Sequence, residues 1–246
     1  MKNFKQILLL VMLWSGAGVI MQCQHDDSEV IPVQGPDPIV RGTETLSCTD
    51  CTPLVSNGAS DDFNSGAVPV GTWYFDKSHS NVLWETPYKG MGSLLTGRFN
   101  YFVLEDLTFS EADPTAISFE GYVRLNTVNT GEPGRDGGCL LTTYGTEAAR
   151  TTETENIASL VSIGGSGRYS TTDEGYFVDA NLTFHGITKE VTVKLFYEPQ
   201  SDQGTYTMAG ISAEYEMFAL SDFAITSTNI DDKVKVRINA LMRNKK

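Results

Sequence analysis

The chain has 246 residues, with 18 Lys and Arg against 31 Asp and Glu, which gives a formal net charge of -13 at pH 7. Its hydrophobic share of 40% and aromatic share of 10% are typical of a folded globular domain and exclude a disordered chain. The acidic balance excludes a sequence-independent nucleic-acid binder, because such binding needs Lys and Arg clustered against phosphates.

Residues 1–22 have the pattern of an export signal. Two lysines precede the apolar run 7–14, which is too short to span a bilayer before the small residues that follow it. Two cleavages compete, since residues 15–17 suit an ordinary signal peptidase and residues 20–23 resemble a bacterial lipoprotein box. An acidic stretch follows Cys23, as in surface-exported lipoproteins of some Gram-negative bacteria. We therefore expect lipidation at Cys23 and attachment to the outer membrane or cell surface. Ordinary cleavage would instead give a periplasmic or secreted protein.

Residues 23–70 predict a flexible acidic tether, because they are rich in Pro, Gly, Ser, Asp and Asn and lack periodicity. Within the tether, Cys48 and Cys51 are spaced as C-x-x-C, for which we expect a local disulfide in an exported chain. A metal site would need two more ligands, and only His25 and Cys139 remain. A redox motif would open a helix after a strand, and no such pattern is visible.

From residue 71 to residue 246, apolar and polar residues alternate with the period of strands that have one buried face. Turn-forming stretches such as His185-Gly186 separate the runs, so most pairings should be antiparallel hairpins. The pattern predicts an all-β domain with one apolar interior and leaves open whether it is a sandwich or a closed barrel. The alternating runs lie at 73–75, 82–84, 99–103, 117–125, 178–184, 191–197 and 234–240.

Six stretches in chain order resemble the YceI-like family. They are GTWYFDKSHSNVLWE (71–85), LLTGRFNYF (94–102), VRLNTVNTGEPGRD (123–136), LTFHGITKEVTVKL (182–195), ALSDFAI (219–225) and IDDKVKVRINA (230–240). The resemblance implies an antiparallel β-barrel of about eight strands, similar to that of the lipocalins. It also implies non-catalytic binding of an isoprenoid-like lipid, of quinone or polyprenyl type, inside the barrel and without a cofactor.

A barrel of this size is either filled by side chains or able to hold one slender ligand. In the filled case the protein would be a structural or interaction module without a lipid ligand, and the alternation alone fits both cases. For the ligand-binding case, the expected cavity-lining residues are Trp84, Phe99, Tyr101, Leu182, Phe184, Val193 and Leu195. At predicted strand ends, His79, Arg135 and His185 are candidates for the cavity rim.

Catalysis and metal binding find little support in the sequence. A hydrolase would pair a histidine with a serine such as Ser80 and an acid such as Asp76, but no nucleophile elbow is present. His79 and His185 lack the spaced partners that a metal site needs. We expect a protein that is not an enzyme and that meets a membrane only through its lipid anchor. The sequence leaves its oligomeric state open.

Overall fold

The computed structural model describes residues 45–49, 51, 71–137, 157–204 and 206–246. The predicted leader, Cys23 and most of the predicted tether lie outside these ranges. None of the helices in the described ranges is long and apolar enough to cross a bilayer.

The described residues form thirteen strands in one antiparallel sheet. The strands are β1 (Thr45–Thr49), β2 (Trp73–Phe75), β3 (Asn81–Pro87), β4 (Leu94–Phe99), β5 (Phe102–Ser110), β6 (Ser118–Arg124), β7 (Val128–Asn129), β8 (Ile157–Ser162), β9 (Arg168–Ser170), β10 (Gly175–Phe184), β11 (Ile187–Asp202), β12 (Tyr206–Ala219) and β13 (Lys233–Lys245). Short helical turns are η1 (Lys77–His79), η2 (Pro114–Ala116), η3 (Leu125–Thr127), α2 (Pro133–Gly137) and η4 (Leu220–Phe223).

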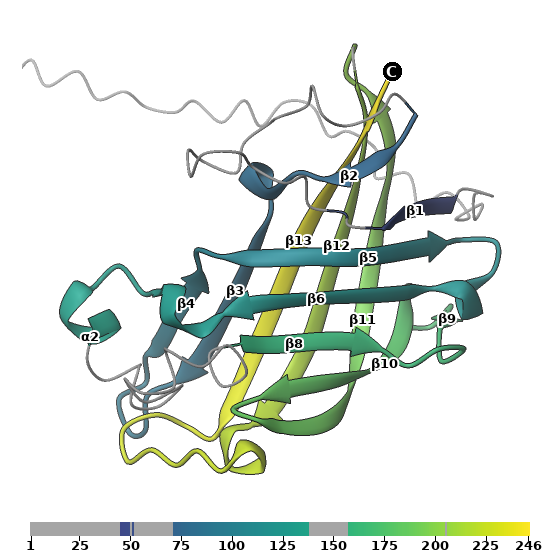
Figure 1. The fold of residues 1–246 in the computed structure, drawn as a ribbon. Coiled ribbons are helices and arrows are strands. Elements are labelled where there is room, and N and C mark those ends of the chain that lie inside the picture. The colour runs from purple at the N-terminus through teal and green to yellow at the C-terminus, as the bar shows by residue number, and fades with distance from the viewer. Residues whose placement is uncertain (1–44, 50, 52–70, 138–156, 205) are drawn as a thin grey trace, which may run out of the picture. The chain divides into compact units, whose positions relative to one another are not determined.

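The strand order is β1-β5-β6-β8-β10-β11-β12-β13-β3-β4-β7, with β2 added on β13 and β9 on β10. The sheet folds over itself, so that β5, β6 and β8 run across the layer formed by β3, β13, β12 and β11 (Figure 1). This crossed arrangement encloses one interior, as in orthogonally packed sheets. The all-β antiparallel expectation is confirmed. The described sheet is not closed, because its end strands β1 and β7 do not pair with each other, and it has more strands than the expected eight.

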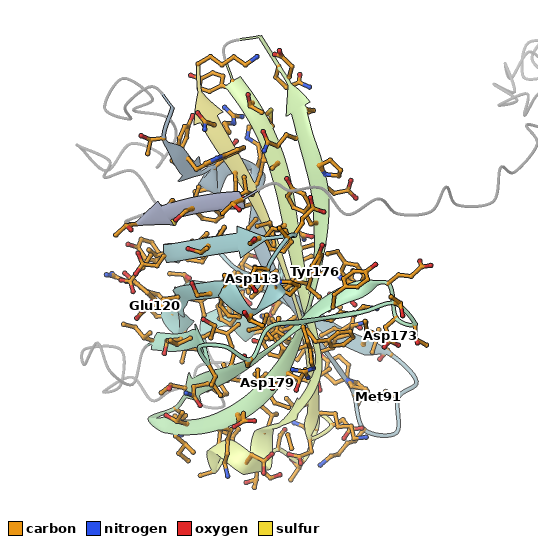
Figure 2. The ribbon with its side chains drawn as sticks, turned by 90° about the vertical axis from the view of Figure 1, so that its right-hand side faces the viewer. Met91, Asp113, Glu120, Asp173, Tyr176 and Asp179 are labelled. Atoms are coloured by element: carbon orange, nitrogen blue, oxygen red, sulfur yellow. A yellow bond between two sulfur atoms is a disulfide. The ribbon has the colours of Figure 1, made fainter. Side chains whose placement is uncertain are left out.

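Strand register explains why alternating apolar residues reach the interior together. Ala213 of β12 pairs with Ile238 of β13, which pairs with Val82 of β3, which pairs with Phe99 of β4. Since side chains on one face recur every second residue, neighbouring rows on the same face lie two residues away. In Figure 2, Tyr176 lies inside the domain, whereas Glu120 lies on its outer face.

The next inward row joins Tyr215, Val236, Trp84 and Gly97 in the same way. The Trp84 indole lies against Gly97, where an added Cβ would approach the ring atom Cζ2 to 2.5 Å. Glycine is therefore needed at position 97 for its lack of a side chain. Because Gly97 has no side chain, the Trp84 indole can occupy this space, and its large aromatic surface stays buried at the centre of the layer.

Residues 45–49, assigned above to the tether, instead form β1, which pairs with β5 from Thr45–Ser110 to Thr49–Asp106. Leu46 and Cys48 point inward and are buried. The structure joins Cys48 to Cys51 in a disulfide, the pairing expected from their spacing. The tether interpretation missed this strand because two inward residues in a polar context are too few to establish a period.

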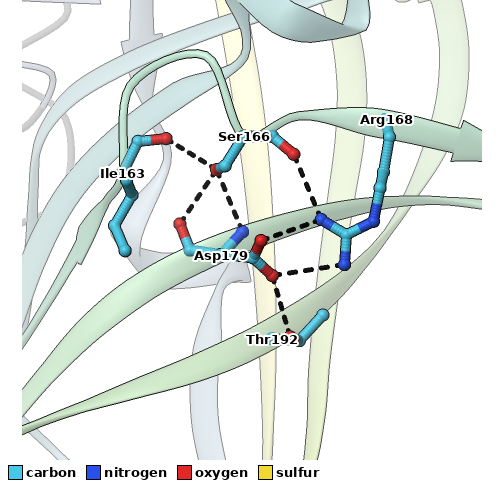
Figure 3. A network of polar contacts seen from close by, with 5 residues as sticks. All are labelled: Ile163, Ser166, Arg168, Asp179 and Thr192. Atoms are coloured by element: carbon cyan, nitrogen blue, oxygen red, sulfur yellow. Dashed lines mark hydrogen bonds and ion pairs between the residues drawn. The ribbon is translucent and has the colours of Figure 1, made fainter.

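A polar network on the outer face ties the β8–β9 turn to β10 (Figure 3). Asp179 accepts hydrogen bonds from both terminal nitrogens of Arg168, at 3.0 and 3.2 Å, and from the Thr192 hydroxyl at 2.8 Å. The Ser166 hydroxyl donates to the Ile163 carbonyl at 2.6 Å and accepts from the Asp179 amide at 3.1 Å. The donors from Arg168 and Thr192 hold the pKa of Asp179 below its ordinary value.

Candidate functional site

A cavity of about 140 Å³ lies inside the sheet, lined by residues of β2 to β6, β8 and β10 to β13 and of η3. Its wall is almost entirely hydrocarbon and aromatic. None of the lining residues in the described ranges carries a charge, and among them only Trp84, Tyr122, Ser159 and Tyr215 bring side-chain polar atoms. Small apolar pockets with few polar groups are the usual form of a lipid or small-molecule site.

Small residues at inward positions leave this space open. Ala158, Ala213 and Ala240 line the cavity from three different strands, and Gly121 adds a fourth position without a bulky side chain. Gly121 is also tightly placed, because an added Cβ would lie 2.7 Å from the Val103 carbonyl oxygen. The interior is therefore not completely filled by side chains. The alternative prediction of a filled barrel required that it be filled.

Six of the seven residues expected to line a cavity do so, namely Trp84, Phe99, Leu182, Phe184, Val193 and Leu195. Their part in binding a ligand stays a prediction. Phe184 also packs edge-on against Phe218 and Phe223, with ring centroids 5.8 and 5.4 Å apart, so this end of the cavity has an aromatic wall.

Tyr101 is the exception and does not line the cavity. Its ring lies between the Lys77 ammonium group at 4.3 Å and the Arg124 guanidinium group at 4.6 Å, a cation–π arrangement outside the apolar interior. The error has a backbone cause. The chain turns between β4 and β5, which end and begin at Phe99 and Phe102, and the next buried residue after this corner is Phe102. The period of two is broken there.

The sequence analysis overlooked Tyr215, which lines the cavity and is 7% exposed. A signal was present, because Ala209, Ile211, Ala213 and Tyr215 alternate along β12 and all four are buried. Two alanines made the run too weakly apolar to be recognised as a strand face.

Burial raises the pKa of the Tyr215 phenol above its ordinary value of 10.0. Burial is also the main cause of a raised pKa at Tyr122, to which Tyr101 adds. Both phenols are therefore neutral hydrogen-bond donors at physiological pH, in a cavity wall that has no charged lining residue.

His79, a predicted rim residue, does not line the cavity and serves a structural network instead. Its Nδ1 atom lies 2.8 Å from Oδ2 of Asp76, whose side chain is 1% exposed. The same carboxylate oxygen lies 2.6 Å from Nε of Arg243 near the end of β13. Ser80 completes the link, because its hydroxyl donates to the Asp76 carbonyl at 2.6 Å and accepts from the Leu241 amide at 2.8 Å.

Arg135 and His185 also lie away from the cavity lining. The Arg135 guanidinium donates to the Thr130 hydroxyl at 2.9 Å and to the Tyr88 hydroxyl at 3.3 Å, which fixes the short helix α2. His185 and Gly186 join β10 to β11 with φ angles of 52° and 73°. Two central residues with positive φ are typical of the type I′ turn that matches strand twist, so His185 is a hairpin residue.

The two histidines lie at opposite ends of β13. Next to His185, Phe184 contacts Phe223 of η4, and the neighbouring Leu220 amide donates to the Asp232 carbonyl just before β13 begins. His79 instead contacts Arg243, and ten residues of strand span roughly 33 Å. A site that combined both imidazoles is excluded. The described ranges also contain no group of three or more His, Cys, Asp or Glu side chains placed to hold a metal ion.

Comparison with known proteins identifies the family. The YceI-like domain model matches residues 73–242. The UPF0312 protein YE1254 of Yersinia enterocolitica is 29% identical over 174 residues, which cover 67% of this chain and 81% of that protein. The structure of BcnA from Burkholderia cenocepacia is similar with a TM-score of 0.52 at 17% identity, over 68% of this chain and 98% of BcnA.

A mutant of the Campylobacter jejuni YceI protein gives a TM-score of 0.51 at 15% identity, over 75% of this chain and 97% of that one. At these identities the two solved structures show a shared fold. The family match extends over most of the chain and confirms the resemblance of the six stretches. This protein belongs to the YceI-like domain family.

Proposed function

We propose that the domain binds a hydrophobic isoprenoid-like lipid, of quinone or polyprenyl type, in its internal cavity and does not transform it. The observation that carries the proposal is the cavity of about 140 Å³ with an almost wholly apolar wall. Membership of the YceI-like family supports the isoprenoid class, as the resemblance of the sequence implied.

The size of the cavity suggests which part of a ligand it holds. About 140 Å³ has room for about ten water-sized groups, or roughly two isoprene units. Burying about ten carbon atoms at about 0.8 kcal/mol each contributes about 8 kcal/mol before the cost of association is subtracted. A longer tail would extend past half-exposed lining residues such as Leu160 of β8 and Phe119 of β6.

Native mass spectrometry of the purified protein, followed by organic extraction, tests this function directly. We expect an added mass that extraction removes and that mass spectrometry identifies as a prenyl-bearing lipid. A protein that carries no lipid, and takes up none from an added extract of bacterial membranes, would contradict the proposal and favour a structural or interaction module.

We further propose that the protein is exported and tethered to the cell envelope by lipidated Cys23. The charged and apolar leader and the acidic stretch after Cys23 support this assignment. The test is metabolic labelling with an alkyne fatty acid in a Gram-negative host, with Cys23→Ala as the control. Label on the wild type and not on the variant is expected. A mature protein that begins before or after residue 23 would contradict the anchor and leave lipid binding in the cavity unaffected.

A further inference from the structure

The hydroxyl group of Tyr215 is the polar feature of the cavity that the packing of the protein does not explain. Tyr215 is 93% buried, as its exposure of 7% shows, and it lines the cavity from β12. In register it lies beside Val236 of β13, which lies beside Trp84 of β3, so its ring belongs to the central inward row of the sheet.

This hydroxyl donates to no atom of the described residues. Within the described part of the chain, the Tyr215 ring contacts the ring of Phe218, at a centroid distance of 6.2 Å. Tyr215 is one of the cavity-lining residues, so its side chain borders the space that a ligand would occupy. A buried hydroxyl without a partner loses the hydrogen bonds that it makes in water, which is unfavourable for the empty protein. A phenylalanine would fill the same space without that loss, so the hydroxyl calls for a partner inside the cavity.

The chemistry of the wall restricts this partner. Among the described residues, the lining contains no Lys, Arg or His that would neutralise a phosphate, and no Asp or Glu that would accept from a cation. An ionic group that entered the cavity would lose its hydration without compensation. Tyr215, kept neutral by burial, offers one O–H donor.

We propose that Tyr215 donates a hydrogen bond to an uncharged oxygen atom of the ligand. Within the proposed lipid-binding function, on which this inference rests, the site then selects prenyl-type molecules that carry a carbonyl, ether or hydroxyl oxygen. It disfavours pure hydrocarbons, and any charged head group stays outside the cavity.

A comparison of two short ligands with two variants tests the proposal. The ligands are geraniol, a two-unit isoprenoid alcohol, and 2,6-dimethyl-2,6-octadiene, which has the same carbon skeleton without the hydroxyl. Binding to wild type, Tyr215→Phe and Tyr176→Phe is measured by competition with a fluorescent lipid. Tyr176 is the matched control, because it is equally buried and does not line the cavity.

We expect Tyr215→Phe to weaken geraniol binding by roughly 2- to 12-fold, the worth of one neutral hydrogen bond, and to leave the hydrocarbon unchanged or tighter. Tyr176→Phe should shift neither ligand. Equal effects of Tyr215→Phe on both ligands, or no effect on either, would overturn the role of the hydroxyl while lipid binding stands. If neither ligand binds wild type and no other lipid does, the proposed function fails as well.

Another hydroxyl group of the wall provides an internal check. Ser159 of β8 lines the cavity and is half-exposed. If Ser159→Ala reproduces the loss of geraniol binding and Tyr215→Phe does not, the selective contact belongs to Ser159. Geranyl phosphate tests the charge requirement. Binding of this anion that is tighter than binding of geraniol, and that Tyr215→Phe abolishes, would contradict an uncharged partner.

Discussion

Filling the cavity from Ala213 should weaken ligand binding without unfolding the protein. Ala213 lines the cavity, and Ala213→Leu adds three carbon atoms to a space of about 140 Å³. Three buried methyl or methylene groups contribute about 2.4 kcal/mol of favourable burial, which offsets the cost of adjusting the neighbours. We therefore expect the free energy of unfolding to stay within about 1 kcal/mol of wild type.

The same three carbon atoms displace ligand. Losing the burial of about three ligand carbons at about 0.8 kcal/mol each weakens geraniol binding by about 2.4 kcal/mol, or roughly 50-fold in Kd. The assays are urea unfolding followed by tryptophan fluorescence and competition with a fluorescent lipid.

Ala209→Leu is the matched control on the same face of the same strand. Ala209 is 1% exposed, does not line the cavity, and pairs with fully buried Met242. The same enlargement should therefore overpack the core and lower the free energy of unfolding by about 1–3 kcal/mol. If Ala213→Leu is destabilised as much as Ala209→Leu, or binds geraniol as wild type does, the space beside Ala213 is not the binding site.

Three other substitutions, two of them with a control substitution, test by urea unfolding the contacts that hold the sheet around the cavity. Asp76→Asn leaves Arg243, whose side chain is 13% exposed, without its charged partner and should cost about 3–5 kcal/mol, whereas His79→Ala, at an exposed imidazole, should cost below about 1 kcal/mol. Gly167→Ala places a Cβ against a backbone carbonyl of η2 and should destabilise by at least about 1–3 kcal/mol, while Gly164→Ala, with open space around it, should not. The lowered pKa of Asp179 stabilises the fold above its ordinary value of 3.8, and this contribution is lost as pH falls through the folded pKa. Asp179→Asn should therefore be less stable than wild type at neutral pH and approach wild type as the pH falls through the folded pKa of Asp179; equal stability at pH 7 would contradict the network.

Much of the strand layer could be predicted from the alternation of apolar and polar residues. Paired residues of neighbouring strands point to the same face, so the apolar residues of each strand face inward together. Val193 and Leu195 were expected to be inward, and both are buried against the cavity. The prediction failed where the chain changes direction. At Tyr101 the chain turns between β4 and β5, and the inward-facing positions change from odd to even residue numbers. The alternation of residue types does not reveal such a turn. The strand containing Cys48 was missed because its pairing with β5 depends on contacts far along the sequence.

The polar residues that made the family recognisable connect or terminate secondary-structure elements. Asp76 and His79 connect η1 to the end of β13, and His185 forms a hairpin turn. Sequence reasoning placed such residues at a cavity rim because histidine and arginine so often touch ligands. His79 and Arg135 form hydrogen bonds within the protein and His185 lies in a turn, and a contact of these three residues with a ligand stays a prediction.

For the proposed lipid, we expect selectivity to depend on residues of the cavity wall that no motif marks. The volume of the cavity depends on small side chains such as Ala213 and Ala240, and its one deeply buried hydroxyl group belongs to Tyr215. We expect Ala213 and Ala240 to tolerate change more readily than Asp76, because a larger side chain there enters the cavity, whereas the Asp76 carboxylate is paired with Arg243. Family membership consequently predicts the barrel and its apolar interior, whereas the length and the oxygen chemistry of the ligand have to be read from the cavity wall of each chain.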